Sequence, residues 1–291
     1  DSINVNLDAL YSRYTTAGSR FQLGFVNYDE SWTPGTPVFT NALFDDQQRV
    51  TKVTQTGENT MVELLNLSEP RRTDMYQVGG NVKFAINDHW TVITDAAYST
   101  AKDKNNGDNR FIVARGFVDS IDIDYSTGHM LPDVSINPGL TSEQTYGAHY
   151  SSNSGTGVAD TVTDVKLLAE YVPDATWMTK VLMGANFVRQ SKSQQEFSSK
   201  DPSAFSRGGY YLQRLGYTVD KSKVFNKGEF ELFRIPKEVF VPANFDNFLA
   251  GEPSKTPQPW PSFDYDKLLN YYRSINAEAA DKFIVPGMKK A

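Results

Sequence analysis

The sequence predicts a mainly β protein: a segment of an antiparallel, up-and-down transmembrane β-barrel, with long extracellular loops and a short helix near the C-terminus. Three observations lead to this prediction. Long segments alternate apolar and polar residues, as strands with one apolar face do. Pairs of these segments are joined by turns of only three or four residues. Their other ends are joined by long connections, and short turns on one side with long loops on the other are typical of outer-membrane barrels.

Alternation identifies five strands. In the first of them, apolar residues from Ile3 to Tyr11 fall on one face and mostly polar residues on the other. The polar turn Asn87-Asp88-His89 joins the second strand to the third, and a turn beginning at Pro173 joins the fourth to the fifth. The predicted membrane strands cover residues 2–14, 74–86, 89–101, 162–172 and 176–189.

These strands make residues 1–190 a barrel segment with two long extracellular loops. Within the second loop, residues 109–125 also alternate, but Arg115 and Asp119 fall on the apolar face. An arginine that faces lipid at mid-membrane costs roughly 2–4 kcal/mol. We therefore expect residues 109–125 to form a strand extension or a loop hairpin above the membrane.

Residues 191–291 lose the alternation and are predicted to be a long extracellular loop region, rich in Ser, Lys, Gly and Pro. A helix is predicted within it at about 263–283, because Asp264 can cap its first turn. Its apolar face would be formed by Leu268, Leu269, Tyr272 and Ile275.

The composition excludes several classes of protein. The net charge is −6 without a basic cluster, so we expect no nucleic-acid partner. Cys is absent, which excludes disulfides and thiolate metal sites. No apolar run approaches the roughly 18 residues of a transmembrane helix. The first residues lack the pattern of a signal peptide, either because there was none or because it was removed.

The strand-and-turn units resemble the TonB-dependent outer-membrane receptors, specifically a large proteobacterial subfamily. The resemblance covers about residues 1–190, and the repetition of weak motifs at a near-constant spacing is what carries it. The matching segments are Asn6-Leu7-Asp8-Ala9-Leu10-Tyr11-Ser12-Arg13, Thr94-Asp95-Ala96-Ala97-Tyr98-Ser99-Thr100-Ala101, and the turns Asn87-Asp88 and Pro173-Asp174. It implies a barrel of about 22 strands around a plug domain that contacts TonB. The plug domain and the remaining strands are absent from these residues, so the chain resembles an internal segment of the barrel.

Six aromatic residues near predicted strand ends are candidates for the aromatic girdle at the membrane interface. They are Tyr11, Trp90, Tyr98, Tyr171, Trp177 and Phe187. Trp90 and Trp177 take matching places after the two short turns. The alternative is the ordinary packing of aromatic side chains in a sandwich core.

Other aromatic residues in the C-terminal region could stack on a ligand such as a sugar. The alternative is that they pack the loop against itself, as a long ordered loop requires. The main candidates are Tyr210, Tyr211 and Trp260, with Phe263, Tyr265, Tyr271 and Tyr272 beside them.

The histidines His89, His129 and His149 could bind a metal with Asp133 or Glu143, but their spacing is not that of metal ligands, so no metal site is predicted.

Residues 103–109 hint at a calcium loop. An EF-hand has Gly at its sixth place and Glu at its twelfth, whereas Gly107 is fifth and Ala114 is twelfth here. A polar turn is therefore predicted. No motif for a nucleophile, a phosphate loop or a zinc protease is present, so we expect neither catalysis nor a cofactor.

The main hypothesis is therefore a part of an outer-membrane receptor for energised nutrient uptake, with its loops extracellular. Its expected partners are outer-membrane lipid, a small extracellular ligand, and the TonB complex through a plug domain outside these residues. The subfamily resemblance favours a carbohydrate over a siderophore. A soluble secreted β-sandwich that binds glycans is the second hypothesis, and a β-rich hydrolase with a clustered carboxylate pair is the third. Long strands with bare apolar faces would favour the barrel, and short strands over a common core the sandwich.

Overall fold

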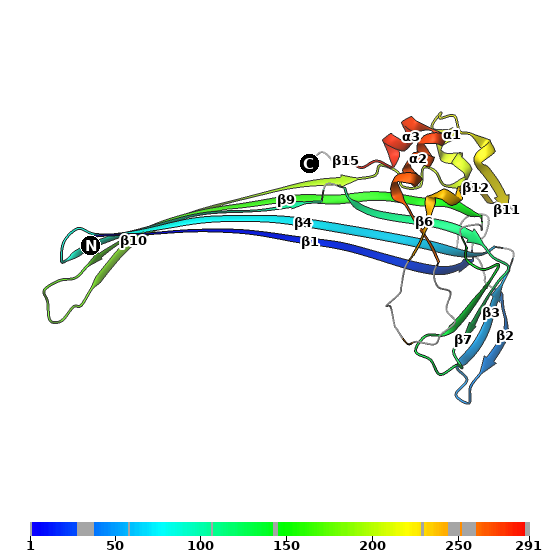
Figure 1. Ribbon diagram of the computed structural model, residues 1–291, viewed down its shortest axis with the longest axis horizontal. Helices are drawn as coiled ribbons and strands as arrows, with labels where there is room; N and C mark the ends of the chain where they lie inside the picture. Colours follow the sequence, from blue (N-terminus) through cyan, green and yellow to red (C-terminus); the bar gives the residue numbers. More distant parts are fainter. Residues whose placement is uncertain are drawn as a thin grey trace.

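The computed structural model describes residues 2–27, 38–57, 59–105, 107–141, 145–227, 230–243, 251 and 260–288. The protein is mainly β, its sheets are antiparallel, and its few helices are short, as the sequence predicts. One long, curved sheet carries a helical cap and a smaller sheet at the same end (Figure 1).

The long sheet is ordered β1-β4-β5-β9-β10-β15, with β6 pairing with both β4 and β9. Its described strands pair antiparallel throughout, and β1 pairs with β4 over its entire length without a register shift. Its strands are β1 (Ile3–Asn27), β4 (Thr60–Ala85), β5 (Trp90–Lys104), β6 (Asn109–Phe117), β9 (Tyr146–Tyr171), β10 (Val181–Ser198) and β15 (Gly287–Met288).

β5 and β6 follow one another along the same line of the sheet. We call the half of the sheet that contains the two short turns the near half, and the half beside the helices the far half. β5 pairs with the near halves of β4 and β9, and β6 pairs with their far halves. The turn between them is held by the side chain of Asn105, whose Nδ2 donates to the carbonyl of Pro70 at 2.9 Å and to Asn109 Oδ1 at 2.6 Å. Of residues 109–125, residues 109–117 therefore form the predicted strand extension, whereas residues 120–124 pair in a separate sheet. The predicted polar turn lies within residues 103–109.

The two short turns lie at one end of the sheet. Asn87 Oδ1 accepts hydrogen bonds from the backbone N–H groups of His89 at 3.0 Å and Trp90 at 2.8 Å, which fixes the turn between β4 and β5. The backbone N–H of Val172 donates to the carbonyl of His89 at 2.9 Å, which ties the second turn to the first. The second turn is longer than predicted, because residues 176–180 precede β10.

The far halves of the strands differ from the prediction. Residues 15–27, 60–73 and 146–161 were predicted to be loop, but they continue β1, β4 and β9. The strands therefore reach 25 or 26 residues in length. Polar residues occupy both faces of the middle of β1, as at Thr15 and Thr16, so alternation is weak there. Pairing with a neighbouring strand keeps this backbone extended.

A separate four-stranded sheet also lies in the regions predicted to be loop. Its order is β2-β3-β7-β8, and it lies beside the far end of the long sheet (Figure 1). Thr54 on β3 donates its hydroxyl to Asp122 on β7 at 2.6 Å. The strands are β2 (Val38–Phe44), β3 (Val50–Thr56), β7 (Ser120–Asp124) and β8 (Asp133–Asn137).

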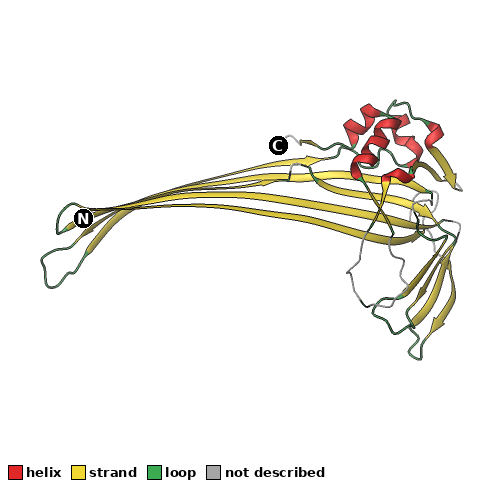
Figure 2. Ribbon diagram, in the orientation of Figure 1, coloured by secondary structure: helices red, strands yellow, loops and turns green. Residues whose placement is uncertain are grey.

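The described residues between 199 and 286 form what we call the cap, which groups all three α-helices of the described chain at the far end of the long sheet (Figure 2). Before residue 263, the region predicted to be a long loop contains short strands and helical turns. The cap elements are α1 (Tyr210–Arg214), β11 (Val224–Lys227), β12 (Phe230–Ile235), β13 (Phe240–Pro242), β14 (Pro261–Phe263), α2 (Tyr265–Ile275) and α3 (Ala277–Phe283), with 3-10 turns η1 (Arg207–Gly209), η2 (Lys221–Lys223) and η3 (Lys237–Val239).

The predicted C-terminal helix is two helices. Asp264 caps α2 as expected, with its side chain accepting from the backbone N–H of Lys267 at 3.1 Å. The backbone of Asn276 is extended, at φ −160° and ψ 110°, and this ends α2. The Asn276 side chain then accepts from the backbone N–H of Ala279 at 2.9 Å and starts α3. No helix of the described chain is long and apolar enough to cross a membrane.

The hydrophobic core lies between the cap and the far half of the long sheet, and Ile121 on β7 and Val134 on β8 of the smaller sheet are also part of it. From the sheet, Leu64 on β4, Ala114 on β6 and Ala148 on β9 are almost fully buried. From the cap, Leu268 and Tyr272 on α2 are almost fully buried in the same core. The near half of the long sheet contributes nothing to this core, and many of its apolar side chains are exposed.

Candidate functional site

One face of the near half of the sheet is apolar and exposed. Residues directly opposite one another on paired strands lie on the same face, so the register defines the set. Leu7 is 82% exposed, and Phe187 is 63% exposed in the same row of the register. We call the apolar residues of this face the apolar band: Ile3, Val5, Leu7, Ala9, Val78, Val82, Phe84, Val92, Ala96, Tyr98, Val165, Leu167, Ala169, Met183, Ala185 and Phe187. The same rows of the register also contain Gly80, Thr94, Thr163 and, in the row of Tyr98, Arg189.

Aromatic pairs lie at both ends of the apolar band. The rings of Trp90 and Tyr171 are 4.7 Å apart at the short-turn end, and those of Tyr11 and Tyr76 are 4.9 Å apart at the other. Thr100 is opposite Tyr76, so the two pairs are separated by the ten residue steps from Trp90 to Thr100 along β5. Ten residues of strand span about 33 Å. At the usual tilt of barrel strands, about 40°, this corresponds to a height of about 25 Å.

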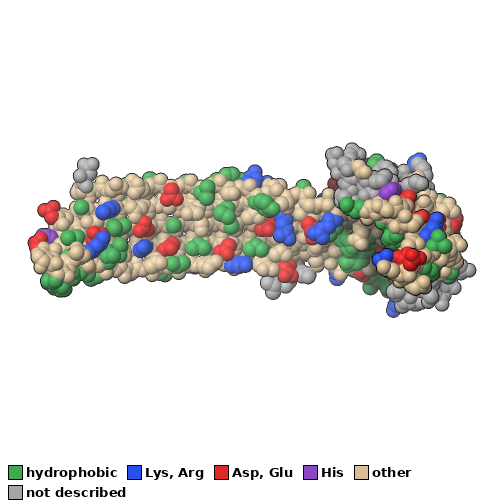
Figure 3. Space-filling view, turned by 90° about the horizontal axis from the view of Figure 1, so that it is seen from below, with side chains coloured by type: hydrophobic (Ala, Val, Ile, Leu, Met, Phe, Trp, Pro, Cys, Tyr) green, Lys and Arg blue, Asp and Glu red, His purple; other side chains and the backbone are tan. Residues whose placement is uncertain are grey.

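The opposite face of the near half is largely polar. Asn6 and Asp8 on β1 lie on it beside Asn81 on β4, and Asp95 and Lys166 lie on β5 and β9. Viewed from the side away from the cap, the sheet carries charged side chains of both signs along its strands (Figure 3). The two faces of the same strands therefore differ in chemistry.

A shallow hollow of about 200 Å³ lies on the polar face. Gly79 lines it, and a Cβ there would lie 2.7 Å from Asp8 Oδ1. Asn81 Nδ2 donates to Asp95 Oδ1 at 2.7 Å at its edge. Asp164 joins these carboxylates around the hollow, so the third hypothesis has candidate acidic residues here.

The predicted girdle residues take different places. Tyr11, Trp90 and Tyr171 belong to the pairs at the ends of the apolar band. Tyr98 lies on the same face, one row from the Tyr11–Tyr76 pair toward the short turns. Phe187 lies opposite Val165, in the middle rows of the band.

Trp177 does not match Trp90. It lies in the turn before β10 and is 82% exposed, whereas Trp90 begins β5 and packs on Tyr171. Sequence reasoning missed Tyr76 as a girdle candidate. The signal that could have found it is the register: pairing the first two predicted strands places Tyr76 directly opposite Tyr11.

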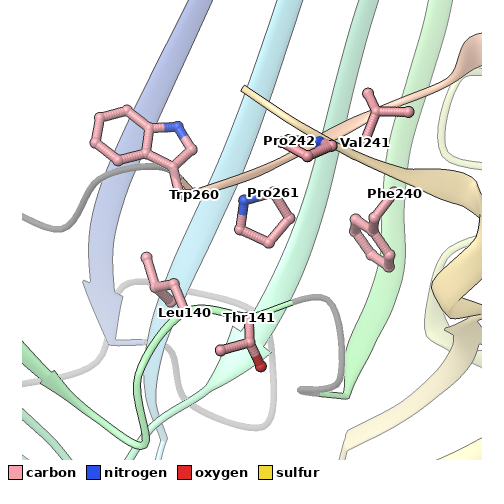
Figure 4. A pocket seen from close by; sticks show the side chains of 7 residues that line it. All are labelled: Leu140, Thr141, Phe240, Val241, Pro242, Trp260 and Pro261. Carbon is pink, nitrogen blue, oxygen red and sulfur yellow. The ribbon is translucent and has the colours of Figure 1, made fainter. Parts of the chain in front are cut away.

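Among the aromatic ligand candidates, Trp260 lines a pocket at the edge of the cap. The pocket has a volume of about 270 Å³, and Figure 4 shows the indole of Trp260 on one side and the ring of Phe240 on another. Its lining residues are Leu140, Thr141, Phe240, Val241, Pro242, Trp260 and Pro261.

Tyr210 and Tyr211 are not part of this pocket. They lie on α1, with their rings 5.6 Å apart in an edge arrangement. The guanidinium of Arg214 lies 5.8 Å from the Tyr210 ring, and that of Arg207 lies 5.9 Å from the Tyr211 ring. The structure therefore does not bring the three main candidates together.

The remaining aromatic candidates pack the cap. Tyr272 stacks on Phe205 with 4.5 Å between ring centroids, and its hydroxyl shares a 2.9 Å hydrogen bond with the Ser151 hydroxyl on β9. Burial raises the pKa of the Tyr272 hydroxyl above its usual value. Tyr265 bonds Asn153 on β9 through its hydroxyl, and Phe263 is buried. For these residues the packing alternative holds.

The histidines are dispersed. His89 Nδ1 is 2.8 Å from the carbonyl of Val172 at the short turns, and His129 Nδ1 lies 3.9 Å from Asp133 Oδ1 between β7 and β8. His149 is on β9 beneath the cap, where burial, then Arg115 and Arg207, lower its pKa to about 3. Glu143 lies outside the described residues, and no described cluster of three or more His, Asp or Glu side chains could hold a metal ion.

The chain matches no protein-family model and no curated protein.

Proposed function

We propose that this chain is part of the wall of an outer-membrane β-barrel and serves a receptor for energised nutrient uptake. The observation that carries the proposal is the apolar band, which is exposed on one face, bounded by aromatic pairs at both ends, and backed by a polar face. Outer-membrane barrels have an outward apolar band about 25 Å tall between aromatic girdles, with a polar interior. The separation of the two aromatic pairs agrees with that height.

The lengths of the strands favour this function over a soluble glycan-binding sandwich. Five strands of 15 to 26 residues run side by side. Side chains such as Leu7 and Phe187 are exposed without a second sheet over them. Large exposed apolar patches mark interaction with lipid or another protein. In a sandwich the same side chains would face a shared core.

The edges of the sheet support a larger assembly. In the described chain, the outer edge of β1 has no strand partner, and β10 pairs on its outer side only at Phe197 and Ser198. Unpaired backbone groups in lipid cost several kcal/mol each. Further strands are therefore required on both edges, as in a closed barrel.

The ligand proposal rests on the resemblance to the receptor subfamily, and a carbohydrate is preferred to a siderophore. Growth tests it. The gene should be induced on a glycan as sole carbon source, and its deletion should slow that growth. Induction only by iron limitation would contradict the carbohydrate preference.

The sidedness of the chain tests the barrel. The chain has no Cys, so single cysteines can be labelled cleanly. In intact cells, a membrane-impermeant maleimide should label Ser126→Cys, between β7 and β8, at the far end. It should label Asp88→Cys, in the short turn, only after the cells are permeabilised. Equal labelling of both in intact cells would contradict the arrangement.

A further inference from the structure

The two rows of side chains directly beyond the Tyr11–Tyr76 pair are strongly cationic. Arg13 Nε lies 2.7 Å from Asp74 Oδ1, Lys104 Nζ lies 3.0 Å from Asp74 Oδ2, and an Arg72 guanidinium nitrogen lies 3.3 Å from the same oxygen. Lys102 is directly opposite Asp74 in the register of β4 and β5 and is exposed. We call Arg13, Arg72, Lys102 and Lys104 the cationic cluster.

Asp74 organises this cluster from within. Its side chain is 1% exposed, whereas those of Arg13, Arg72 and Lys104 are 46%, 46% and 50% exposed. The Tyr11 hydroxyl, which belongs to the aromatic pair, also donates to Asp74 Oδ1, at 3.3 Å. Three of the four cations contact Asp74 and Lys102 lies opposite it, so the cluster keeps a surplus of three positive charges over this one carboxylate. The surplus positive charge is therefore held in place and open to a partner.

The cluster occupies a defined strip. Its residues share the face of the apolar band, because positions 13, 72, 102 and 104 keep the alternation of that face. Below it lie Tyr11 and Tyr76. Above it the cap covers the same face: Pro286 packs closely on Gly107, and the Arg110 guanidinium lies 4.1 Å from the Tyr265 ring.

We propose that the cationic cluster binds phosphate groups of membrane-lipid headgroups, an inference that rests on the proposed membrane function. If lipid chains cover the apolar band, headgroups lie at the level just past the aromatic pair. Guanidinium and ammonium groups bind phosphate by charge-assisted hydrogen bonds. The cap would stand directly above this headgroup layer.

The test uses the full chain in vesicles of equal parts phosphatidylcholine and phosphatidic acid. Native mass spectrometry counts the phosphatidic acid molecules that stay bound after extraction. The double variant Arg72→Gln/Lys102→Gln leaves Arg13 and Lys104 to hold Asp74. A basic residue near a lipid surface contributes about fivefold in affinity. We therefore expect this variant to bind phosphatidic acid about 25-fold more weakly.

The matched control is Arg71→Gln/Lys192→Gln. It removes the same charge from exposed residues at a similar level on the opposite face, and it should bind within twofold of the unmodified protein. Equal losses in the two double variants, or none in either, would overturn the inference. Added inorganic phosphate should not displace the lipid. If inorganic phosphate displaced the lipid and bound as tightly as phosphatidic acid, the cluster would be a free-phosphate site and the lipid proposal would fail.

A fluorophore on Val78→Cys in the same vesicles separates the two proposals. Lipid contact at Val78 with no preference for phosphatidic acid would refute the headgroup site alone. Absence of lipid contact at Val78 would refute the membrane function and the headgroup site with it.

Discussion

Acid should loosen the cap through His149. The folded structure lowers the pKa of this side chain to about 3, chiefly by burial and further through Arg115 and Arg207. An unfolded histidine has a pKa of about 6.5. Protonation therefore favours the open state: the stabilisation is complete above the unfolded pKa and is lost as the pH falls toward 3. Between pH 7 and pH 5 the loss is about 2 kcal/mol, or about 25-fold in the open population.

A buried thiol measures this opening. Ser206 is 4% exposed at the start of the cap, and cysteine has nearly the same shape as serine. The labelling rate of Ser206→Cys, divided by that of an unstructured thiol peptide at each pH, gives the open population. It should rise about 25-fold from pH 7 to pH 5. Adding His149→Gln should abolish most of this rise, whereas adding His129→Gln at an exposed site should leave it. An unchanged rise with His149→Gln would refute the assignment.

Two further predictions concern packing and the buried ion pair, both measured by the same thiol assay at pH 7. Leu268→Ala removes a fully buried side chain and should destabilise the cap by about 3 kcal/mol. Leu269 is only partly buried, so Leu269→Ala should destabilise the cap by less than half of that. Equal effects of the two variants would contradict the assigned core face of α2. Glu63→Gln removes the carboxylate that lies 2.7 Å from the buried Arg115 guanidinium, and it should destabilise the far end of the sheet by about 3 kcal/mol. A loss of stability below about 0.5 kcal/mol would show that this ion pair is replaceable.

The near half of the sheet follows from the sequence because its signals are local. The polar turn at Asn87 and the alternation on each side of it specify one hairpin. The N-terminal capping of helix α2 by Asp264 is equally local, since Asp264 directly precedes the helix. The break at Asn276 was missed because the alanines that follow it favour helix. The residue that starts α3 therefore looked like the interior of one helix.

The rest of the molecule depends on contacts between distant residues. Arg13 and Asp74 form one cluster only once β1 and β4 are aligned, and Trp260 lines a pocket only once β13 pairs with β14. The far halves of the strands carry Pro70 and adjacent arginines, which weaken the local pattern. Their extended form depends on strand pairing and on the cap, neither of which can be read from a short window.

The most direct test of the membrane proposal is a single-cysteine scan along β4. An environment-sensitive fluorophore is placed in turn at Gln77, Val78, Asn81 and Val82, and lipids that carry a quencher in their acyl chains are added. We predict strong quenching at positions 78 and 82, in the apolar band, and weak quenching at 77 and 81, on the polar face. Equal quenching on both faces, or none on either, would contradict a barrel wall.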